Sequence, residues 1–258
     1  MSATSGQSSS HSALRDQVSD VEWQTRCDLA ALYRLTHHYK MTDMIYTHLS
    51  ARLPDQPDHF LINAYGDMFD EVTASNLVKL DMDGNVVGDP TRFNVAGFNI
   101  HSGVYGERAD VNCVMHTHTR AGVAVAATER GLLPISQHSM IVMPEVSYYD
   151  YSGPGTFETP QEIGAGCGKS HCVIMRNHGL LTSGHTIQAT FNRMYYLESA
   201  CQIQCSAAAM GDLRSMDEAV ERDTFTVYSK RQANPEMGQL EWPALLRLLD
   251  RRGANYRD

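Results

Sequence analysis

The sequence predicts a single α/β domain in which helices flank a mainly antiparallel sheet. Two segments, 111–119 and 173–179, have the continuous apolar character of buried strands. Longer segments on either side of them repeat apolar residues at the spacing of an α-helix. The chain has 258 residues, of which 42% are hydrophobic, and it shows no internal repeat or clear linker, so one large core is expected.

The two ends of the chain differ in composition from this central part. Residues 1–18 are polar and rich in serine, lack the apolar stretch of a signal peptide, and are predicted to form a disordered tail. The domain is predicted to occupy residues 19–232. Residues 233–258 are predicted to form a C-terminal arm with an amphipathic end, which packs either on a neighbouring subunit or on its own chain.

Local signals predict the first elements of the domain. Ser19 or Asp20 can cap a helix that extends to Lys40, because a short polar side chain accepts a hydrogen bond from the free N–H groups of the first turn. Segments 45–53 and 60–64 have the residue pattern of strands and are separated by a short connection that contains proline. Together they predict a β-hairpin.

The later elements alternate between helices and strands. A helix is predicted over residues 94–105, directly before the first buried strand, and a helix of small residues over 120–129 follows that strand. Segment 132–143 is predicted to be a strand that carries His138. A long helix with broad apolar faces is predicted over residues 186–210.

Three histidines stand at the ends of the two buried strands. His116 and His118 are two residues apart, so their side chains share one face of an extended strand. His178 follows the second apolar run and precedes Gly179. If the two strands are neighbours, the three imidazoles form a facial set that suits Zn²⁺, or Fe²⁺, Mn²⁺ or Co²⁺, and leaves coordination positions open. The alternative is a polar rim at the strand ends, since the chain has 12 histidines.

Composition argues against several classes of partner. The formal net charge is -9 and lysine and arginine do not cluster, which argues against a nucleic-acid surface. No apolar run has the length of a membrane-spanning helix, so no membrane partner is expected. The six cysteines show no C-x-x-C spacing, which favours reduced thiols and a cytoplasmic protein.

Five segments, in this order and at these spacings, carry a resemblance to a known family: FLINAYGDMFDEVTASNLVKLDMDGNVV, FNVAGFNIHSGVY, VMHTHT, LPISQHS and MRNHGLL. Over roughly residues 23–209 the chain resembles the class II aldolase and adducin family, and most of all its adducin-type bacterial branch, related to fuculose-phosphate aldolase and ribulose-phosphate 4-epimerase. The resemblance implies a three-layer α/β/α fold with a central antiparallel sheet and a homotetramer with active sites near subunit interfaces. It also implies a small-molecule substrate and a Zn²⁺ held by His116, His118 and His178.

The chain departs from the family pattern at positions that matter for catalysis. Family aldolases carry a glutamate, in a Ser-Ser-Glu segment, four residues before the histidine that aligns with His101. Here this segment is Val-Ala-Gly, and Gly97 cannot transfer a proton. Because the family's phosphate-binding serines are also replaced, a sugar-phosphate substrate is not expected. The position of the family's acid/base tyrosine aligns with His138, which can move protons near neutral pH, and Tyr151 is a second candidate.

Three functional hypotheses follow. The first is a metal-dependent lyase, either an aldolase or a decarboxylase, that acts on a small hydroxy-carbonyl compound or 2-oxo acid. Its metal would act as a Lewis acid for the charge left by bond cleavage, and the missing glutamate favours decarboxylation because loss of CO₂ needs less proton abstraction. The second is an adducin-like binding or scaffold protein without catalysis. The third is a non-haem iron oxygenase, although its usual pattern of two histidines and one carboxylate is not found.

Overall fold

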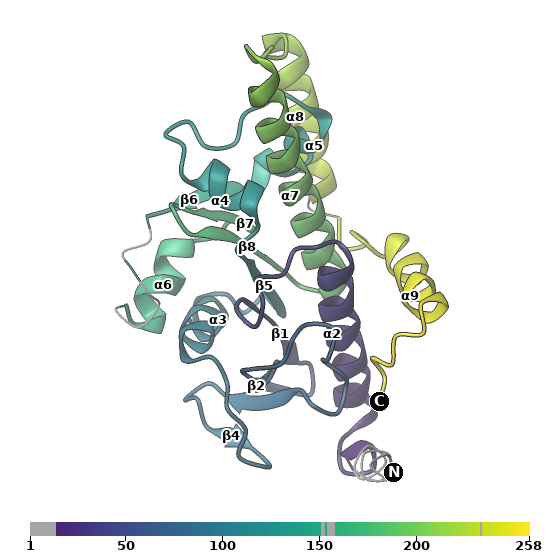
Figure 1. Cartoon of the computed structure of the whole chain (residues 1–258). Helices are drawn as coiled ribbons and strands as arrows, with labels where there is room; N and C mark the ends of the chain where they lie inside the picture. Colours follow the sequence, from purple (N-terminus) through teal and green to yellow (C-terminus); the bar gives the residue numbers. More distant parts are fainter. Residues whose placement is uncertain (1–13, 151–152, 154–157, 233) are drawn as a thin grey trace.

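The structure is a computed structural model that describes residues 14–150, 153, 158–232 and 234–258. Within these residues, eight strands form one sheet in the order β4-β3-β2-β1-β5-β8-β7-β6 (Figure 1). Neighbouring strands are antiparallel except for the parallel pair β6 and β7. The strands are β1 (His48–Leu53), β2 (Gln56–Ile62), β3 (Val78–Asp81), β4 (Val86–Val87), β5 (Cys113–Thr117), β6 (Val146–Tyr149), β7 (Cys172–Met175) and β8 (Gly179–Gly184).

Helices cover both faces of this sheet, so the predicted α/β class and its three layers are confirmed. Helices α3 and α6 pack on one face, and α2, α4 and α7 pack on the other, with α5 against α7 and α8 against α5 (Figure 1). The helices are α2 (Asp20–His38), α3 (Val95–Glu107), α4 (Arg120–Ala126), α5 (Gln137–Val142), α6 (Pro160–Cys167), α7 (Ile187–Met210), α8 (Glu218–Gln232) and α9 (Glu241–Arg251), with a 3₁₀ turn at Met143–Glu145.

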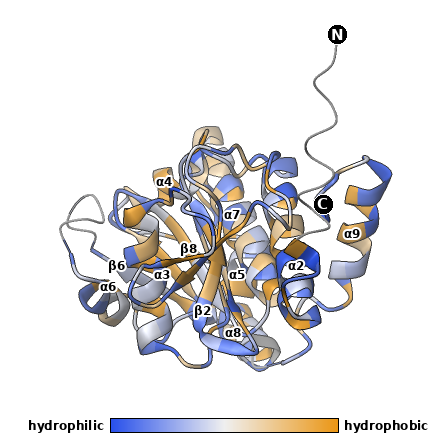
Figure 2. Cartoon of the chain, turned by 90° about the horizontal axis from the view of Figure 1, so that it is seen from below, coloured by the Kyte–Doolittle hydropathy of each residue, from blue (hydrophilic) through white to orange (hydrophobic). Residues whose placement is uncertain are grey.

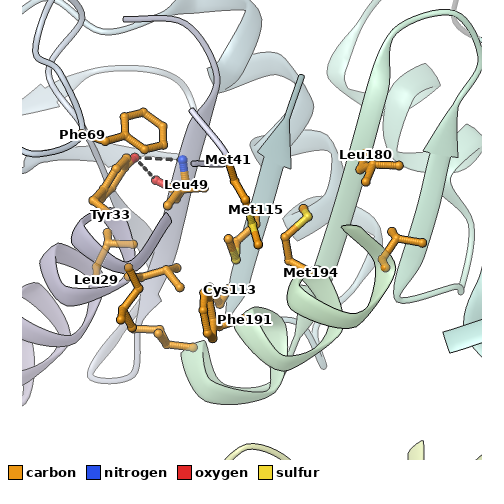
Figure 3. Packing of buried hydrophobic residues seen from close by; sticks show 14 of the residues in the cluster. Leu29, Tyr33, Met41, Leu49, Phe69, Cys113, Met115, Leu180, Phe191 and Met194 are labelled. Carbon is orange, nitrogen blue, oxygen red and sulfur yellow. Dashed lines mark hydrogen bonds between the residues drawn. The ribbon is translucent and has the colours of Figure 1, made fainter. Parts of the chain in front are cut away.

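The alternation of side chains along the strands divides the apolar residues between two cores. In β5, Met115 faces the helices α2 and α7, whereas Val114 faces α3. On the first face, Tyr33 packs edge-on against Phe69, and its hydroxyl accepts a hydrogen bond of 2.8 Å from the backbone N–H of Leu49 (Figure 3). Figure 2 shows apolar residues concentrated in the sheet and on the inward sides of the helices.

Several predicted elements form where the sequence places them. Ser19 caps α2 through its side chain, Asn94 caps α3, and Thr186 caps α7, so these helices begin where the polar cap residues predict. The predicted strand 45–53 begins later, at His48, because Thr47 adopts a φ of 68°, which lies outside the β region.

The predicted strand 132–143 is wrong. His138 lies instead on the short helix α5, whose first turn is held by a reciprocal cap between Ser136 and Ser139. The cap satisfies backbone groups locally, and the apolar residues that follow, Met140 to Val142, are buried against the helical layer rather than in the sheet. After this helix and the 3₁₀ turn that follows it, β6 extends the sheet beside β7.

The C-terminal arm packs on its own chain. Helix α9 lies against α2, where the indole N–H of Trp242 donates a 3.2 Å hydrogen bond to Asp28. Tyr256 is 1% exposed, and its carbonyl accepts a hydrogen bond from the backbone N–H of Ala74. Residues 1–13 of the predicted tail lie outside the described residues. In the part of the chain that the structure describes, no helix is both long and apolar enough to span a membrane.

Candidate metal centre

The sheet brings the three strand-end histidines together. His116 lies on β5, His118 follows that strand directly, and His178 lies in the turn between β7 and β8. Strands β5 and β8 are antiparallel neighbours, which places the turn beside the end of β5. Gly179 makes this approach possible, because a Cβ atom at that position would lie 2.4 Å from the carbonyl oxygen of Thr117.

The Nε2 atoms of the three histidines point toward one another. His116 Nε2 lies 2.9 Å from His118 Nε2 and 3.3 Å from His178 Nε2, and the third distance is 2.9 Å. A metal with M–N bonds of about 2.0–2.1 Å and ligand angles between tetrahedral and right angles separates its ligand atoms by roughly 2.9–3.4 Å. The three nitrogens therefore fit a single divalent cation, and among the described residues they form the group of His, Cys, Asp and Glu side chains able to hold one.

Hydrogen bonds at the opposite ring nitrogens fix two of these imidazoles. The Nδ1–H of His116 donates to the carbonyl oxygen of Leu180 at 3.0 Å. The Nδ1–H of His118 donates to the Asp43 carboxylate at 3.1 Å. A neutral imidazole with its proton on Nδ1 presents a lone pair on Nε2, so both rings are held in the tautomer that binds a metal.

Burial favours the neutral form of His116 and His178. It lowers the pKa of His116 well below the ordinary histidine value, and the nearby rings of His178 and His118 lower it further. Burial, followed by the neighbouring His118, lowers the pKa of His178 to about 4. The neutral form is the one that coordinates metals, so protons compete weakly for the site at neutral pH.

Asp43 belongs to a strained loop between α2 and β1. Lys40, Met44 and Thr47 in this loop have φ values of 59°, 49° and 68°, a region that residues other than glycine seldom adopt. A cleft of about 920 Å³ opens beside this loop. Its lining includes His118, Asp43, the buried Glu198 and several cationic side chains.

A second pair of histidines lies directly behind the first group. His48 on β1 is the register partner of His116 on β5, and their ring centroids are 5.1 Å apart. His48 Nδ1 is 2.8 Å from His101 Nε2, and His101 Nδ1 bonds to the Ser50 hydroxyl. Burial lowers the pKa of His101 to about 3 and that of His48 well below its ordinary value. Sequence alternation puts His48 and Ser50 on one face but does not say which face, so this group is not predictable from sequence alone.

Of the two residues predicted to transfer protons, the structure describes His138, and no contact among the described residues joins it to the three histidines. His138 lies on α5, and its ring packs on Tyr196 of α7 with centroids 5.9 Å apart. Tyr151 lies outside the described residues. Asp43 was not predicted either, because a loop contact between residues 75 positions apart leaves no local signal in the sequence.

Curated relatives extend over nearly the whole chain. A protein of Caulobacter vibrioides, whose name assigns it provisionally to aldolase class 2, is 44% identical over 253 residues, which cover 95% of this chain and 96% of the relative. Alpha-adducin of Rattus norvegicus is 37% identical over 247 residues, which cover 88% of this chain but 33% of the adducin.

Solved structures share the fold. An aldolase II superfamily protein from Pseudomonas syringae has a TM-score of 0.89 at 43% identity, with 95% of this chain and 100% of that chain covered. An L-fuculose 1-phosphate aldolase from Glaciozyma antarctica has a TM-score of 0.80 at 25% identity, with 100% and 97% covered. The model of the Class II Aldolase and Adducin N-terminal domain matches residues 27–205. The chain therefore belongs to the class II aldolase and adducin family.

Proposed function

We propose that this protein is a metal-dependent carbon–carbon lyase, an aldolase or decarboxylase, that acts on a small hydroxy-carbonyl compound or 2-oxo acid. The observation that carries the proposal is the convergence of three Nε2 atoms within 3.3 Å of one another, two of them held as lone-pair donors from behind. The site has three protein ligands, and such a set leaves positions open for a substrate. The solved L-fuculose 1-phosphate aldolase with the same fold supports lyase chemistry.

His116, His118 and His178 would hold the cation, with Zn²⁺ as the first choice and Fe²⁺, Mn²⁺ or Co²⁺ as alternatives. The bound cation supplies a Lewis acid that polarises substrate oxygens and stabilises the negative charge left by bond cleavage. Asp43 and the Leu180 carbonyl orient the ligand rings, so that the coordinating nitrogens need no rearrangement when substrate binds. His138 and Tyr151 stay the proposed groups for proton transfer, from this subunit or from a neighbour.

The substrate is proposed to lack a phosphate. Residues 95–97 are Val-Ala-Gly and offer neither a hydroxyl nor a carboxylate at the start of α3. The absence of a carboxylate there also favours decarboxylation over proton abstraction from a substrate carbon. We further propose a homotetramer, as the family resemblance implies, and a cytoplasmic location, which the reduced cysteines favour.

A second function, adducin-like binding without catalysis, is favoured by one observation. The chain is 37% identical to alpha-adducin over 88% of its own length. A scaffold would have no need of three histidines with converging Nε2 atoms, which is why the lyase is preferred. A non-haem iron oxygenase is a third candidate that the identity of the bound metal would separate from the first.

The lyase proposal is tested by the metal content and turnover of the protein purified without added metal. About one Zn²⁺ or other divalent ion per subunit is expected, lost in His116→Ala and kept in the control His59→Ala, which alters a histidine on β2. The metal-loaded protein should then release CO₂ or an aldehyde from a panel of 2-oxo and hydroxy acids. A metal-loaded protein inactive on the whole panel would favour the scaffold, and no metal uptake on titration would overturn the metal-dependent enzyme.

A further inference from the structure

The ring of His48 on β1 fills the space that a side chain at Gly97 on α3 would need. A Cβ atom added to Gly97 would lie 2.5 Å from His48 Cδ2 and 2.9 Å from His48 Nε2, distances that real side chains do not adopt. His48 is 3% exposed and belongs to the sheet, so the ring has little room to withdraw. The imidazole therefore takes the volume that any side chain at position 97 would need.

The same ring lies beside the candidate metal ligands without being one of them. His48 and His116 are paired across β1 and β5 and face the same side of the sheet, with α3 packed over it (Figure 1). The nitrogens of His116, His118 and His178 lie within 4.8 Å of one another, and His48 is outside this group. It is thus placed to contact what the cation binds rather than the cation itself.

A chain of buried hydrogen bonds determines where the His48 proton lies. The Tyr105 hydroxyl is 2.7 Å from the Ser50 hydroxyl, which bonds to His101 Nδ1, and His101 Nε2 is 2.8 Å from His48 Nδ1. Tyr105 is 2% exposed, and among the described residues its hydroxyl has Ser50 as its hydrogen-bond partner. An unpaired hydroxyl proton in such a place is costly, so Tyr105 donates to Ser50.

This first donation sets the direction of the others. Ser50 accepts from Tyr105 and has one proton, which it donates to His101 Nδ1. Neutral His101 then carries its proton on Nε2 and donates to His48 Nδ1. Neutral His48 in turn carries its proton on Nε2. This nitrogen makes no hydrogen bond to a described residue, and it is not one of the polar atoms that are fully buried without a partner.

We propose that His48 is a substrate-contacting residue, whose Nε2–H donates a hydrogen bond to an anionic oxygen of a substrate bound at the three histidines. The proposal rests on the proposed metal-dependent function. A fixed N–H aimed at developing negative charge lowers the energy of the transition state, because the donor is already oriented. Gly97 is the residue that admits this donor, and Ser50, His101 and Tyr105 are positioning residues.

The proton position is tested directly by long-range ¹H–¹⁵N correlation spectra of protein with ¹⁵N-labelled histidine, in which His48→Gln identifies the signals. We expect His48 to carry its proton on Nε2 with Nδ1 as an acceptor, and Tyr105→Phe to weaken this preference. A His48 proton found on Nδ1 would overturn the proposal, whatever the metal content.

The substrate contact is tested with oxalate, a bidentate anion, titrated into Co²⁺-loaded protein and followed by visible absorption. His48→Ala should bind Co²⁺ as the wild type does but bind oxalate about tenfold or more weakly. His48→Gln, which keeps an N–H donor, should recover part of this affinity, and His59→Ala should lose none. Equal oxalate affinity in wild type and His48→Ala would overturn the role of His48, whereas failure of the wild type to bind Co²⁺ would overturn the proposed function beneath it.

The steric conflict between a side chain at position 97 and the His48 ring is tested by thermal unfolding of the protein without any ligand. Gly97→Ala should lower the melting temperature in the wild-type background but not in the His48→Ala background, where the ring is gone. Gly106→Ala is the matched control on the same helix, because a Cβ there meets nothing within 4 Å. An equal decrease in melting temperature in both backgrounds would show that the His48 ring does not fill the space next to Gly97.

Discussion

Asp43 lies outside the three histidines and directly fixes the orientation of one of them, His118. Its carboxylate accepts the Nδ1 proton of His118, which raises the electron density of that ring and fixes its coordinating nitrogen. The backbone around it is strained at Met44 and Thr47, and strain of this kind persists where the surrounding structure imposes it. We interpret the loop as a support that holds the Asp43 carboxylate against Nδ1 of His118, on the opposite side of the ring from its coordinating nitrogen.

Asp43→Asn should therefore weaken metal binding without removing it. The amide keeps an acceptor oxygen for His118 but loses the negative charge, and changes to such outer partners usually cost about 10–100-fold in affinity. Competition titration against a chromophoric chelator measures the effect, with the exposed Asp58→Asn as a control. Metal affinity within twofold of the wild type would show that Asp43 does not support the site.

At the scale of single residues, the sequence predicts the three histidines but not the residues that contact them. His116, His118 and His178 are predictable because each follows an apolar run, and strand ends carry their own signal. Asp43 and His48 are not, because the contacts that define them depend on the path of a loop and on the register between β1 and β5. Such contacts join residues far apart in the chain, and no local pattern records them.

At the scale of elements, the approach of β8 to β5 is what assembles the three histidines. The hairpin of β7 and β8 turns through Asn177, whose φ of 57° suits a short polar residue. Immediately after His178, Gly179 lets the two backbones meet. The starts of α2, α3 and α7 are predictable because a polar cap residue precedes an apolar helical pattern, whereas the apolar run of α5 has no clear period and resembles a strand.

Gly179→Ala tests this arrangement. The added methyl group would meet the Thr117 carbonyl, a backbone atom that cannot rotate away, and overpacking of this kind costs about 1–3 kcal/mol. Because His178 is the adjacent residue, metal affinity should fall together with the free energy of unfolding. Urea denaturation and metal titration measure the two effects. A variant with wild-type stability and affinity would mean that β8 has room to move.

At the scale of the molecule, two apolar cores lie on opposite faces of the sheet, and His116 lies on the face that α3 covers. His101 is buried and His171 is half-buried, and neither forms a salt bridge with a described residue. Burial lowers the pKa of His171 to about 4, with the positive charges of Arg193 and Arg108 lowering it further. Burial also lowers the pKa of His101, to about 3.

The metal-free protein should consequently lose stability as the pH falls from about 6.5 toward 4, by roughly 1.4 kcal/mol per pH unit for each proton difference. Over this range the unfolded chain takes up protons at these histidines that the folded protein does not, so acid favours unfolding. His171→Gln should reduce the slope. Chemical denaturation at several pH values measures it, and stability that is constant or rises below pH 6 would contradict the neutral, buried state of these rings.

The central claim, that three histidines hold one cation, is tested most directly by X-ray absorption spectroscopy at the edge of the metal that co-purifies with the protein. The account predicts about three imidazole nitrogens at roughly 2.0–2.1 Å, with outer-shell imidazole scattering, and their loss in His116→Ala. Sulfur neighbours at about 2.3 Å, or a spectrum unchanged in His116→Ala, would place the metal elsewhere and contradict it.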